Sequence, residues 1–378
     1  MQQRFLATAF ILMIFYASGC AHNNTSPGPL ASAGGNCASC HNDAVTRYEA
    51  TPHGLANLSC SDCHSGLEAH LKSQQNIPTI DMHGNSCASC HSVEHTQWAA
   101  SPHAKIPLDL FPNDPRIMQC LKCHQSSGFA AVIASGEDFK SSWAPPPTSE
   151  PEPVTCVACH SPHQARHPQM LRIPKGELCV TCHGGKWQNQ VLTATPTDPY
   201  TPPADHKFGQ GTTTTAPVQP HKDYTAFANH PHNGSDRCVT CHMAQTPGLD
   251  SLGGHTFSMR AKDGAPQNIA ACADCHQNVE SYDINGKQTE VREELTRLES
   301  ALKQRHNGTL PGNQPGACNQ CHKGGSLPFD NDPHLILSNA YEIYKQIDRD
   351  KSLGVHNAPF ALQVLRDALE SINKKYKP

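Results

Sequence analysis

Hydrophobic residues recur at helical spacing in two stretches of the chain, both close to its carboxy-terminal end. The first stretch covers residues 289–305 and predicts an amphipathic helix. Its apolar stripe consists of Val291, Leu295, Leu298 and Leu302. A second helix is predicted to begin near Asn357 and Pro359. Its inward positions are Val364, Leu365, Leu369 and Ile372. Stripes of this kind pack in cores, so we assign them no other role.

The amino-terminal pattern is different. A single charge, Arg4, precedes an apolar run from Phe5 to Tyr16, and small residues lead to Cys20. About twelve apolar residues are too few to span a bilayer as a helix, so residues 1–19 are predicted to be a signal peptide. Residues 191–229 are rich in Pro and Thr and show no period, which predicts a linker or a long surface loop.

The composition is poor for an ordinary core of this length. Only 37% of the 378 residues are hydrophobic, and 31 are prolines. Such a chain cannot offset its ordering entropy unless another group fills the interior. The formal net charge of −4 lacks the excess of basic residues that is typical of nucleic-acid binding. The anomaly is the content of 19 cysteines and 25 histidines, which predicts that the filler is bound through these residues.

The pentapeptide C-x-x-C-H occurs nine times and uses every cysteine except Cys20. The cysteine pairs are Cys37 and Cys40, Cys60 and Cys63, Cys87 and Cys90, Cys120 and Cys123, Cys156 and Cys159, Cys179 and Cys182, Cys238 and Cys241, Cys272 and Cys275, and Cys318 and Cys321. The histidines that follow them are His41, His64, His91, His124, His160, His183, His242, His276 and His322.

Three chemistries use cysteine pairs. Structural zinc needs two such pairs, or one pair with distant histidines, and does not require a histidine after every second cysteine. A disulfide framework suits an exported chain but does not impose one spacing nine times. Covalent haem c requires this spacing: two thiols on one helical turn add to the haem vinyl groups, and the next residue ligates the iron. We therefore expect nine haems c, with the motif histidines as proximal ligands.

Fifteen histidines other than His22 remain for the distal side of nine irons. A second histidine closes the open face of an iron and leaves electron transfer as its role. His53 and His103 each lie twelve positions after a motif histidine and follow Thr-Pro or Ser-Pro, so both are predicted ligands, either to their own motif's iron or to a neighbouring one. His83, His95, His206, His221 and His334 compete for other irons, whereas His167 and His306 are predicted to be structural.

Several segments resemble known multihaem cytochromes. "CSDCHSGLEAH" resembles an element of the tetrahaem family of hydroxylamine oxidation, which implies His70 as a ligand. Residues 156–183 are similar to the doubled CxxCH motif, which implies His163. "NHPHNGSDRCVTCHM" and "GGHTFSM" resemble segments of octahaem and pentahaem nitrite-reducing cytochromes, which implies His255 and either His230 or His232. "GVHNAPFALQVLRDALESINKK" resembles their carboxy-terminal helix, with His356 as ligand.

The predicted organisation follows the motifs. Residues 20–36 form a flexible tether, residues 37–190 a block with haems one to six, and residues 230–378 a block with haems seven to nine. The expected fold is a multihaem cytochrome c that is loop-rich, with short helices, longer helices near the carboxy terminus, little or no sheet, and a core of packed haems.

Location and partners are inferred from the amino terminus. "ASGC" resembles the bacterial lipoprotein box, although Ala17 stands where leucine is usual, and ordinary signal cleavage is the rival reading. No other cysteine is left over, so acylation of Cys20 is the economical assignment. Ala21 after it resembles the outer-membrane default, on the periplasmic face or the cell surface, as in outer-membrane electron-conduit cytochromes. Expected partners are redox proteins, a porin or multihaem protein, or further copies of the chain.

Two functions fit these residues. The leading hypothesis is a lipid-anchored nonahaem electron carrier in respiratory or extracellular electron transfer, and a subunit of a haem filament is a variant of it. The alternative is an enzyme that acts on nitrite or hydroxylamine at one open haem. The lysine-ended CxxCK motif of pentahaem nitrite reductases is missing, but hydroxylamine-oxidising relatives keep a histidine-ended catalytic motif. The spin state of the ferric protein separates the two hypotheses.

Overall fold

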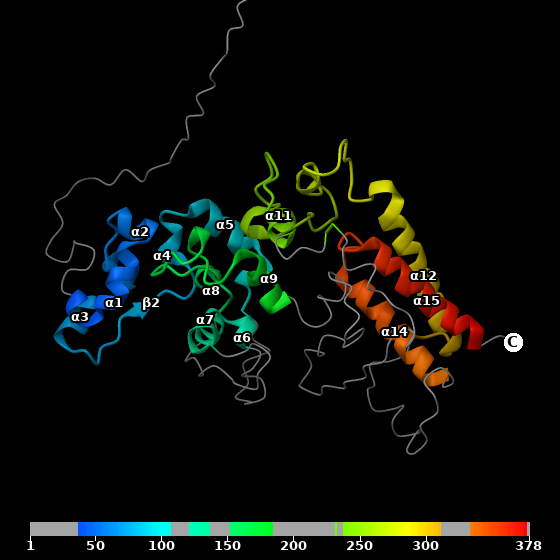
Figure 1. Ribbon diagram of the computed structural model, residues 1–378, viewed down its shortest axis with the longest axis horizontal. Helices are drawn as coiled ribbons and strands as arrows, with labels where there is room; N and C mark the ends of the chain where they lie inside the picture. The colour runs from blue at the N-terminus through cyan, green and yellow to red at the C-terminus, as the bar shows by residue number, and fades with distance from the viewer. Residues whose placement is uncertain are drawn as a thin grey trace, which may run out of the picture.

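A computed structural model describes residues 37–106, 121–136, 152–183, 231–232, 237–310 and 333–375. Figure 1 shows the described elements laid out along the long axis roughly in chain order, from α1–α3 at one end to α12, α14 and α15 at the other. The α-helices are α1 (Ala38–Glu49), α2 (Pro52–Leu55), α3 (Leu67–Lys72), α4 (Asn85–Ala88), α5 (Ser92–Ala100), α6 (Leu121–His124), α7 (Ser126–Ser135), α8 (Cys156–Cys159), α9 (Lys175–His183), α11 (Arg237–His242), α12 (Lys287–Arg305), α14 (Pro333–Asp350) and α15 (Ala358–Lys375).

The remaining regular structure is short. The 3₁₀ turns are η1 (Cys60–Asp62), η2 (Pro102–Ala104), η5 (Pro168–Met170), η7 (Gly254–Thr256), η8 (Ile269–Cys272) and η9 (Ile284–Gly286). The sheet of the described part consists of β1 (His64–Ser65) and β2 (Thr79–Ile80), which pair antiparallel with His64 opposite Ile80. The expectation of a loop-rich, helical fold with little sheet is confirmed for the described residues.

The hydrophobic core lies in the three long helices at the carboxy-terminal end. Figure 1 shows α12, α14 and α15 side by side, and their buried side chains form one cluster of fifteen residues. The predicted stripe of α12 is buried there, and on α15 Val364, Leu365 and Ile372 are fully buried while Leu369 packs against the cluster. The sequence reasoning missed α14, which adds Ile336, Ala340, Ile343 and Ile347 to this core.

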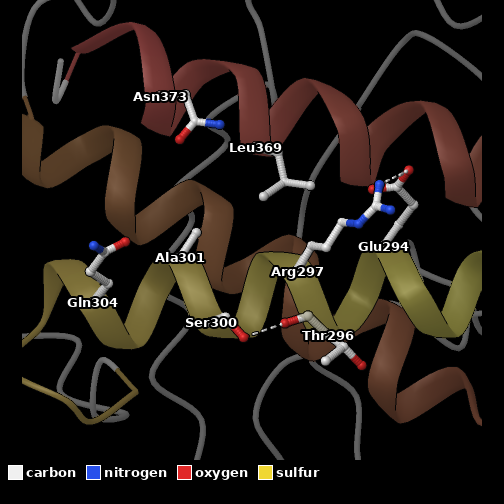
Figure 2. A pocket seen from close by; sticks show the side chains of 8 residues that line it. All are labelled: Glu294, Thr296, Arg297, Ser300, Ala301, Gln304, Leu369 and Asn373. Atoms are coloured by element: carbon white, nitrogen blue, oxygen red, sulfur yellow. Dashed lines mark hydrogen bonds and ion pairs between the residues drawn. The ribbon is translucent and has the colours of Figure 1, made fainter.

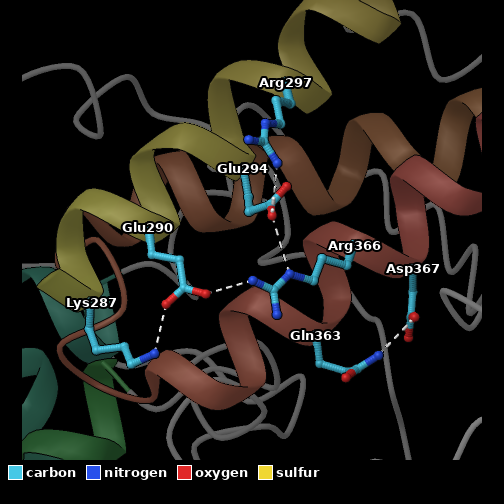
Figure 3. A network of polar contacts seen from close by, with 7 residues as sticks. All are labelled: Lys287, Glu290, Glu294, Arg297, Gln363, Arg366 and Asp367. Carbon is cyan, nitrogen blue, oxygen red and sulfur yellow. Dashed lines mark hydrogen bonds and ion pairs between the residues drawn. The ribbon is translucent and has the colours of Figure 1, made fainter. Parts of the chain in front are cut away.

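A network of ion pairs joins α12 to α15 (Figure 3). The side chain of Glu294 is only 9% exposed and contacts Arg366 Nε at 3.2 Å and Arg297 Nη1 at 3.3 Å. Arg366 Nη2 also lies 2.6 Å from Glu290 Oε1, and Lys287 lies 2.7 Å from the other oxygen of Glu290. Hydrogen bonds from Lys287 and Arg366 lower the pKa of Glu290. The charged network therefore fixes the register of the two helices along the solvent side of the core.

A groove on the same side of the bundle lies beside this network (Figure 2). Its lining comes from α12 and α15 and includes Arg297, Ser300, Leu369 and Asn373. No cysteine or histidine lines it, so it is separate from the motif residues.

Candidate haem-binding sites

Seven motif histidines each face one further histidine, with ring centroids 5.8 to 6.4 Å apart. The facing pairs are His41 with His70 at 6.2 Å, His64 with His163 at 5.8 Å, His91 with His53 at 6.0 Å, His160 with His255 at 6.4 Å, His183 with His103 at 5.9 Å, His242 with His356 at 6.3 Å, and His276 with His232 at 6.1 Å. Aromatic rings in contact also have centroids about 4.5–7 Å apart. The feature that these seven pairs share is that each joins one motif histidine to one histidine outside the motifs.

The separation of the facing rings matches that of two imidazoles bound to one iron atom. A metal–imidazole bond is about 2.0 Å long and the ring centre lies about 1.1 Å behind the nitrogen, so two imidazoles on opposite sides of one iron have centres about 6.2 Å apart. Tetrahedral zinc instead requires four donors around one ion. Within the described ranges, no group of three or more His, Cys, Asp or Glu side chains is placed to hold a metal ion, and no disulfide joins the cysteines.

Each facing histidine comes from a segment beside a different motif. His53 follows the first motif and faces His91 of the third, and His103 follows the third motif and faces His183 of the sixth. His163, which follows the fifth motif, faces His64 of the second. The pairs thus join segments that are far apart along the chain. An iron held in each gap would act as a crosslink between them.

The repeated stretches around His53 and His103 fold in the same way. In each, a helix ends one or two residues before a buried hydroxyl, Thr51 or Ser101, and proline occupies the first position of the short turn that follows. Thr51 Oγ1 accepts a hydrogen bond from the backbone N–H of Gly54, and Ser101 Oγ accepts one from that of His103, both at 3.2 Å. The Thr-Pro and Ser-Pro leads are therefore caps that present the histidine.

The matching aromatic residues anchor these units. The Tyr48 hydroxyl donates to the carbonyl of Leu58 at 2.9 Å, and Trp98 Nε1 donates to the carbonyl of Val154 at 2.8 Å. The first contact closes the loop that carries the turn, and the second ties α5 to the strand-like segment before the fifth motif. The sequence analysis noted the shared histidine offset but assigned no role to these two aromatics.

The turn that carries His255 depends on two glycines and one buried amide. The backbone N–H of His255 donates to Oε1 of Gln97, which is 4% exposed on α5. Gly254 has a φ of +53°, and a Cβ there would lie 2.2 Å from the same Gln97 oxygen. Gly253 adopts φ 68° and ψ −160°, a conformation that is nearly exclusive to glycine.

We expect Gly253→Ala to displace His255 from its place opposite His160. A Cβ at Gly253 would lie 1.6 Å from the carbonyl oxygen of Ala244, so the backbone must move. The expected result is one high-spin ferric haem per molecule, measured by electron paramagnetic resonance (EPR). Gly248→Ala is the matched control, because Gly248 also has a positive φ of 76° but has open space around its Cβ position. A fully low-spin Gly253→Ala protein would contradict the prediction.

Hydrogen bonds at Nδ1 orient several of these rings. The backbone carbonyls of Asn76, Gln169, Phe257 and Val355 accept from His70, His160, His242 and His232 at distances of 2.8, 2.7, 3.0 and 2.6 Å. A carbonyl is only an acceptor, so Nδ1 carries the proton and Nε2 is left with a free lone pair. That tautomer is the one that binds a metal through Nε2.

Burial keeps many of these imidazoles neutral. It lowers the pKa of His103 to about 4, with a smaller contribution from the adjacent His183. Burial likewise lowers the pKa of His53, His64 and His242. A neutral imidazole has the lone pair that metal ligation needs, so these sites are prepared for a cation rather than for protonation.

Thiols of different motifs lie near enough to affect one another's pKa. The close pairs are Cys37 with Cys60, Cys87 with Cys156, Cys123 with Cys182, and Cys179 with Cys238. Charge on Cys90, Cys159 and Cys241 likewise contributes to raising the pKa of Cys63, Cys179 and Cys272, after burial or a nearer thiol. These proximities order the described motifs as first, second, third, fifth, sixth, seventh and eighth, with the fourth beside the sixth.

Two further features indicate a missing partner at the motifs. His95 Nε2 is buried with no hydrogen-bond partner among the described residues, and its ring lies close to the position of Gly84, beside Cys156. A buried unpaired ring nitrogen is rare in a native protein unless a ligand meets it. A hollow of about 490 Å³ beside His276 is lined by apolar residues, Pro247, Ile269, Ala270, Ala273 and Val279, and by the polar Thr246, Gln277 and Asn278. A mostly apolar lining around a motif histidine suits a porphyrin, so the residues fit haem at this position.

The remaining histidines and cysteines of the sequence analysis do not form facing pairs in the described part of the chain. His83, His95 and His167 do not face a motif histidine within the described ranges, and Nδ1 of His306 lies 3.2 Å from Thr309 Oγ1. The predictions for residues 1–36 and 191–229 and for several single residues lie outside the described residues. These single residues are Cys20, Cys120, His206, His221, His230, Cys318, Cys321 and His322. His334 lies on α14, but its side chain is also outside the description.

The comparison with protein families agrees with this chemistry. Residues 147–188 match the family model for the doubled CXXCH motif. The solved structure of the outer cell wall cytochrome OcwA is similar with a TM-score of 0.49 and 18% identity, covering 83% of this chain and 70% of that chain. At this level the likeness bears on neither function nor location. No curated protein sequence matches the chain.

The motif match and the paired histidines support a multihaem c-type cytochrome, which binds haem covalently and transfers electrons. None of the described helices combines the length and the apolar character needed to cross a membrane.

Proposed function

We propose that the protein is a nonahaem electron carrier in which histidine occupies both axial positions of each iron. The observation that carries this proposal is the set of seven facing histidine pairs, with ring centroids 5.8 to 6.4 Å apart. In each pair the motif histidine is the proximal ligand and the facing histidine is the distal ligand. Bound haem iron supplies reversible one-electron chemistry.

The role of the chain is to hold the iron sites closed and close together. A histidine on each side leaves no coordination position for a substrate, which favours electron transfer over catalysis. Contacts between thiols of successive motifs, such as Cys37 with Cys60 and Cys179 with Cys238, support short separations between neighbouring groups. Each distal histidine belongs to a segment beside a different motif, so it ties two motif segments together. These ties keep the separations between neighbouring haems fixed when one haem is oxidised or reduced.

We further propose that Cys20 is acylated and that the carrier is attached to the outer membrane by this lipid. The motif block would then be held by the tether of residues 20–36, where it can meet redox partners. A porin or multihaem protein that leads electrons across the envelope, or further copies of the chain, would suit a carrier that is closed to small substrates.

The spin state of the purified ferric protein tests the function. We expect nine covalently bound haems in a pyridine haemochrome assay and an EPR spectrum that contains only low-spin signals. Adding nitrite or hydroxylamine should leave the spectrum unchanged, because every axial position is occupied. A high-spin ferric signal that shifts with nitrite would instead support the enzyme that acts on nitrogen compounds, and eight or fewer haems would show that one motif is not a haem site.

A further inference from the structure

One of the facing histidines has a partner of a different kind at Nδ1. His70, His160, His232 and His242 donate to neutral backbone carbonyls, whereas His356 Nδ1 lies 2.7 Å from the carboxylate oxygen Oδ1 of Asp350. His356 faces His242, the histidine of the seventh motif. The seventh motif is therefore the described site at which a facing histidine contacts a negative charge.

The Asp350 carboxylate is held in place by its surroundings. It belongs to the last residue of α14, and its side chain is 5% exposed. Its second oxygen accepts a hydrogen bond from Ser352 Oγ. A buried carboxylate with two fixed donors exerts a stronger field than an exposed one, because little water screens it.

The loop between Asp350 and α15 is also rigid. Gln288 of α12 donates from Nε2 to the carbonyl of Ser352 at 2.6 Å, and a Cβ at Gly354 would lie 2.9 Å from Val291. His232, which faces His276 of the eighth motif, donates to the carbonyl of Val355. One loop thus orients the facing histidines of the seventh and the eighth motifs, with a carboxylate on the first and a neutral carbonyl on the second.

We propose that Asp350 is a positioning residue that lowers the reduction potential of the seventh haem below that of haems whose histidines donate to neutral carbonyls. The proposal rests on the proposed ligation by His242 and His356. If His356 holds the iron through Nε2, its Nδ1–H would stay on the ring and donate a hydrogen bond to Asp350, which would give the imidazole partial imidazolate character. The added negative charge favours the ferric over the ferrous state.

A low potential at this site has a consequence for the array. The seventh motif lies on α11, which packs against α9 of the sixth motif and against η8, which ends at the first cysteine of the eighth. A site of low potential between them separates the motifs on its amino-terminal side from those on its carboxy-terminal side. The protein would then contain two groups of electron-accepting sites with an energetic step between them.

The test is a redox titration of the full-length holoprotein carrying Asp350→Asn, which removes the charge and keeps the size of the side chain. At the potential where the seventh haem is half reduced in the unmodified protein, we expect the ratio of reduced to oxidised haem to rise at least tenfold, which is about 59 mV for a one-electron couple. One low-spin EPR component should shift, and the other eight should stay in place.

Asp348→Asn is the matched control. Asp348 lies one half-turn earlier on α14, is 44% exposed and pairs with Lys351 at 3.0 Å. It removes the same charge without touching His356, so its shift should be small. An equal shift in the two variants, or none in Asp350→Asn, overturns the proposal.

Two further variants keep the test decisive. Ser352→Ala is used if Asp350→Asn loses the low-spin haem. This variant keeps the charge of Asp350 and removes the hydrogen bond from Ser352, so the carboxylate interacts more strongly with His356 and the potential of the seventh haem should fall. An unchanged or higher potential refutes the proposal. His356→Ala examines the ligation itself. If it creates no high-spin haem, the proposed ligation fails. If His356→Ala creates a high-spin haem but Asp350→Asn does not change the reduction potential, the ligation stands and only the role of Asp350 is refuted.

Discussion

His103→Ala is expected to convert one ferric haem from low spin to high spin, and that haem belongs to the sixth motif. His103 follows the third motif in the chain, but its ring faces His183 at 5.9 Å. Removing the imidazole leaves the iron beside His183 with an open face, because the turn that carries residue 103 is held by the Ser101 cap and cannot supply another ligand. The variant should also bind one equivalent of carbon monoxide per molecule when reduced, whereas the unmodified protein should bind none.

The identity of the affected haem can be checked by removing motifs. In a background where Cys179 and Cys182 are replaced by alanine, His103→Ala should add no high-spin signal, because the sixth haem is already missing. In a background where Cys87 and Cys90 are replaced, the signal should persist. His83→Ala is the control, since the exposed His83 faces no motif histidine within the described ranges. A signal that disappears with the third motif would show that His103 binds its own motif's iron.

The helical pattern in the sequence predicted part of the fold because it depends on neighbouring residues. Positions three and four apart on a helix share a face, so Val291, Leu295 and Leu298 could be assigned to a core without knowing what they contact. The same signal was present in α14, where Ile336, Ala340, Ile343 and Ile347 recur at helical spacing. Polar residues of the same stretch, such as Asn339 and Gln346, make this stripe less evident in the sequence.

The pairing of histidines depends on contacts that local spacing does not encode. The offset of twelve residues fixes the same capped turn in both repeats, yet His53 faces a motif 38 residues ahead and His103 one 80 residues ahead. His163 instead faces His64, which lies 99 residues earlier in the chain. Which pairs form is decided by how distant segments pack around the bound groups. The sequence therefore predicted which residues are candidates and left open which iron each of them serves.

The distribution of buried side chains explains why haem is needed for folding. Of the 24 buried hydrophobic residues in the described part, sixteen belong to α12, α14 and α15. The other eight are spread over the described residues between 37 and 286, among them Val45, Trp98 and Phe129. Ordering that part of the chain costs backbone entropy at every residue, and so few buried side chains cannot offset it. On the proposed function, the haem macrocycles would supply the apolar surface that these described residues lack.

The haem-free full-length chain is therefore expected to lose its structure over residues 37–286 and to keep helical structure only in the bundle. Limited proteolysis should degrade the motif segments and leave a resistant fragment that contains α12, α14 and α15, with a helical circular dichroism signal well below that of the holoprotein. Leu298→Ala should abolish the fragment, because truncating a fully buried leucine costs about 2–5 kcal/mol and a bundle of this size has little stability to spare. Ser300→Ala, at an exposed position of the same helix, should leave the fragment intact. Protection of residues 37–286 in the absence of haem would show that the motif segments fold through contacts of the chain itself.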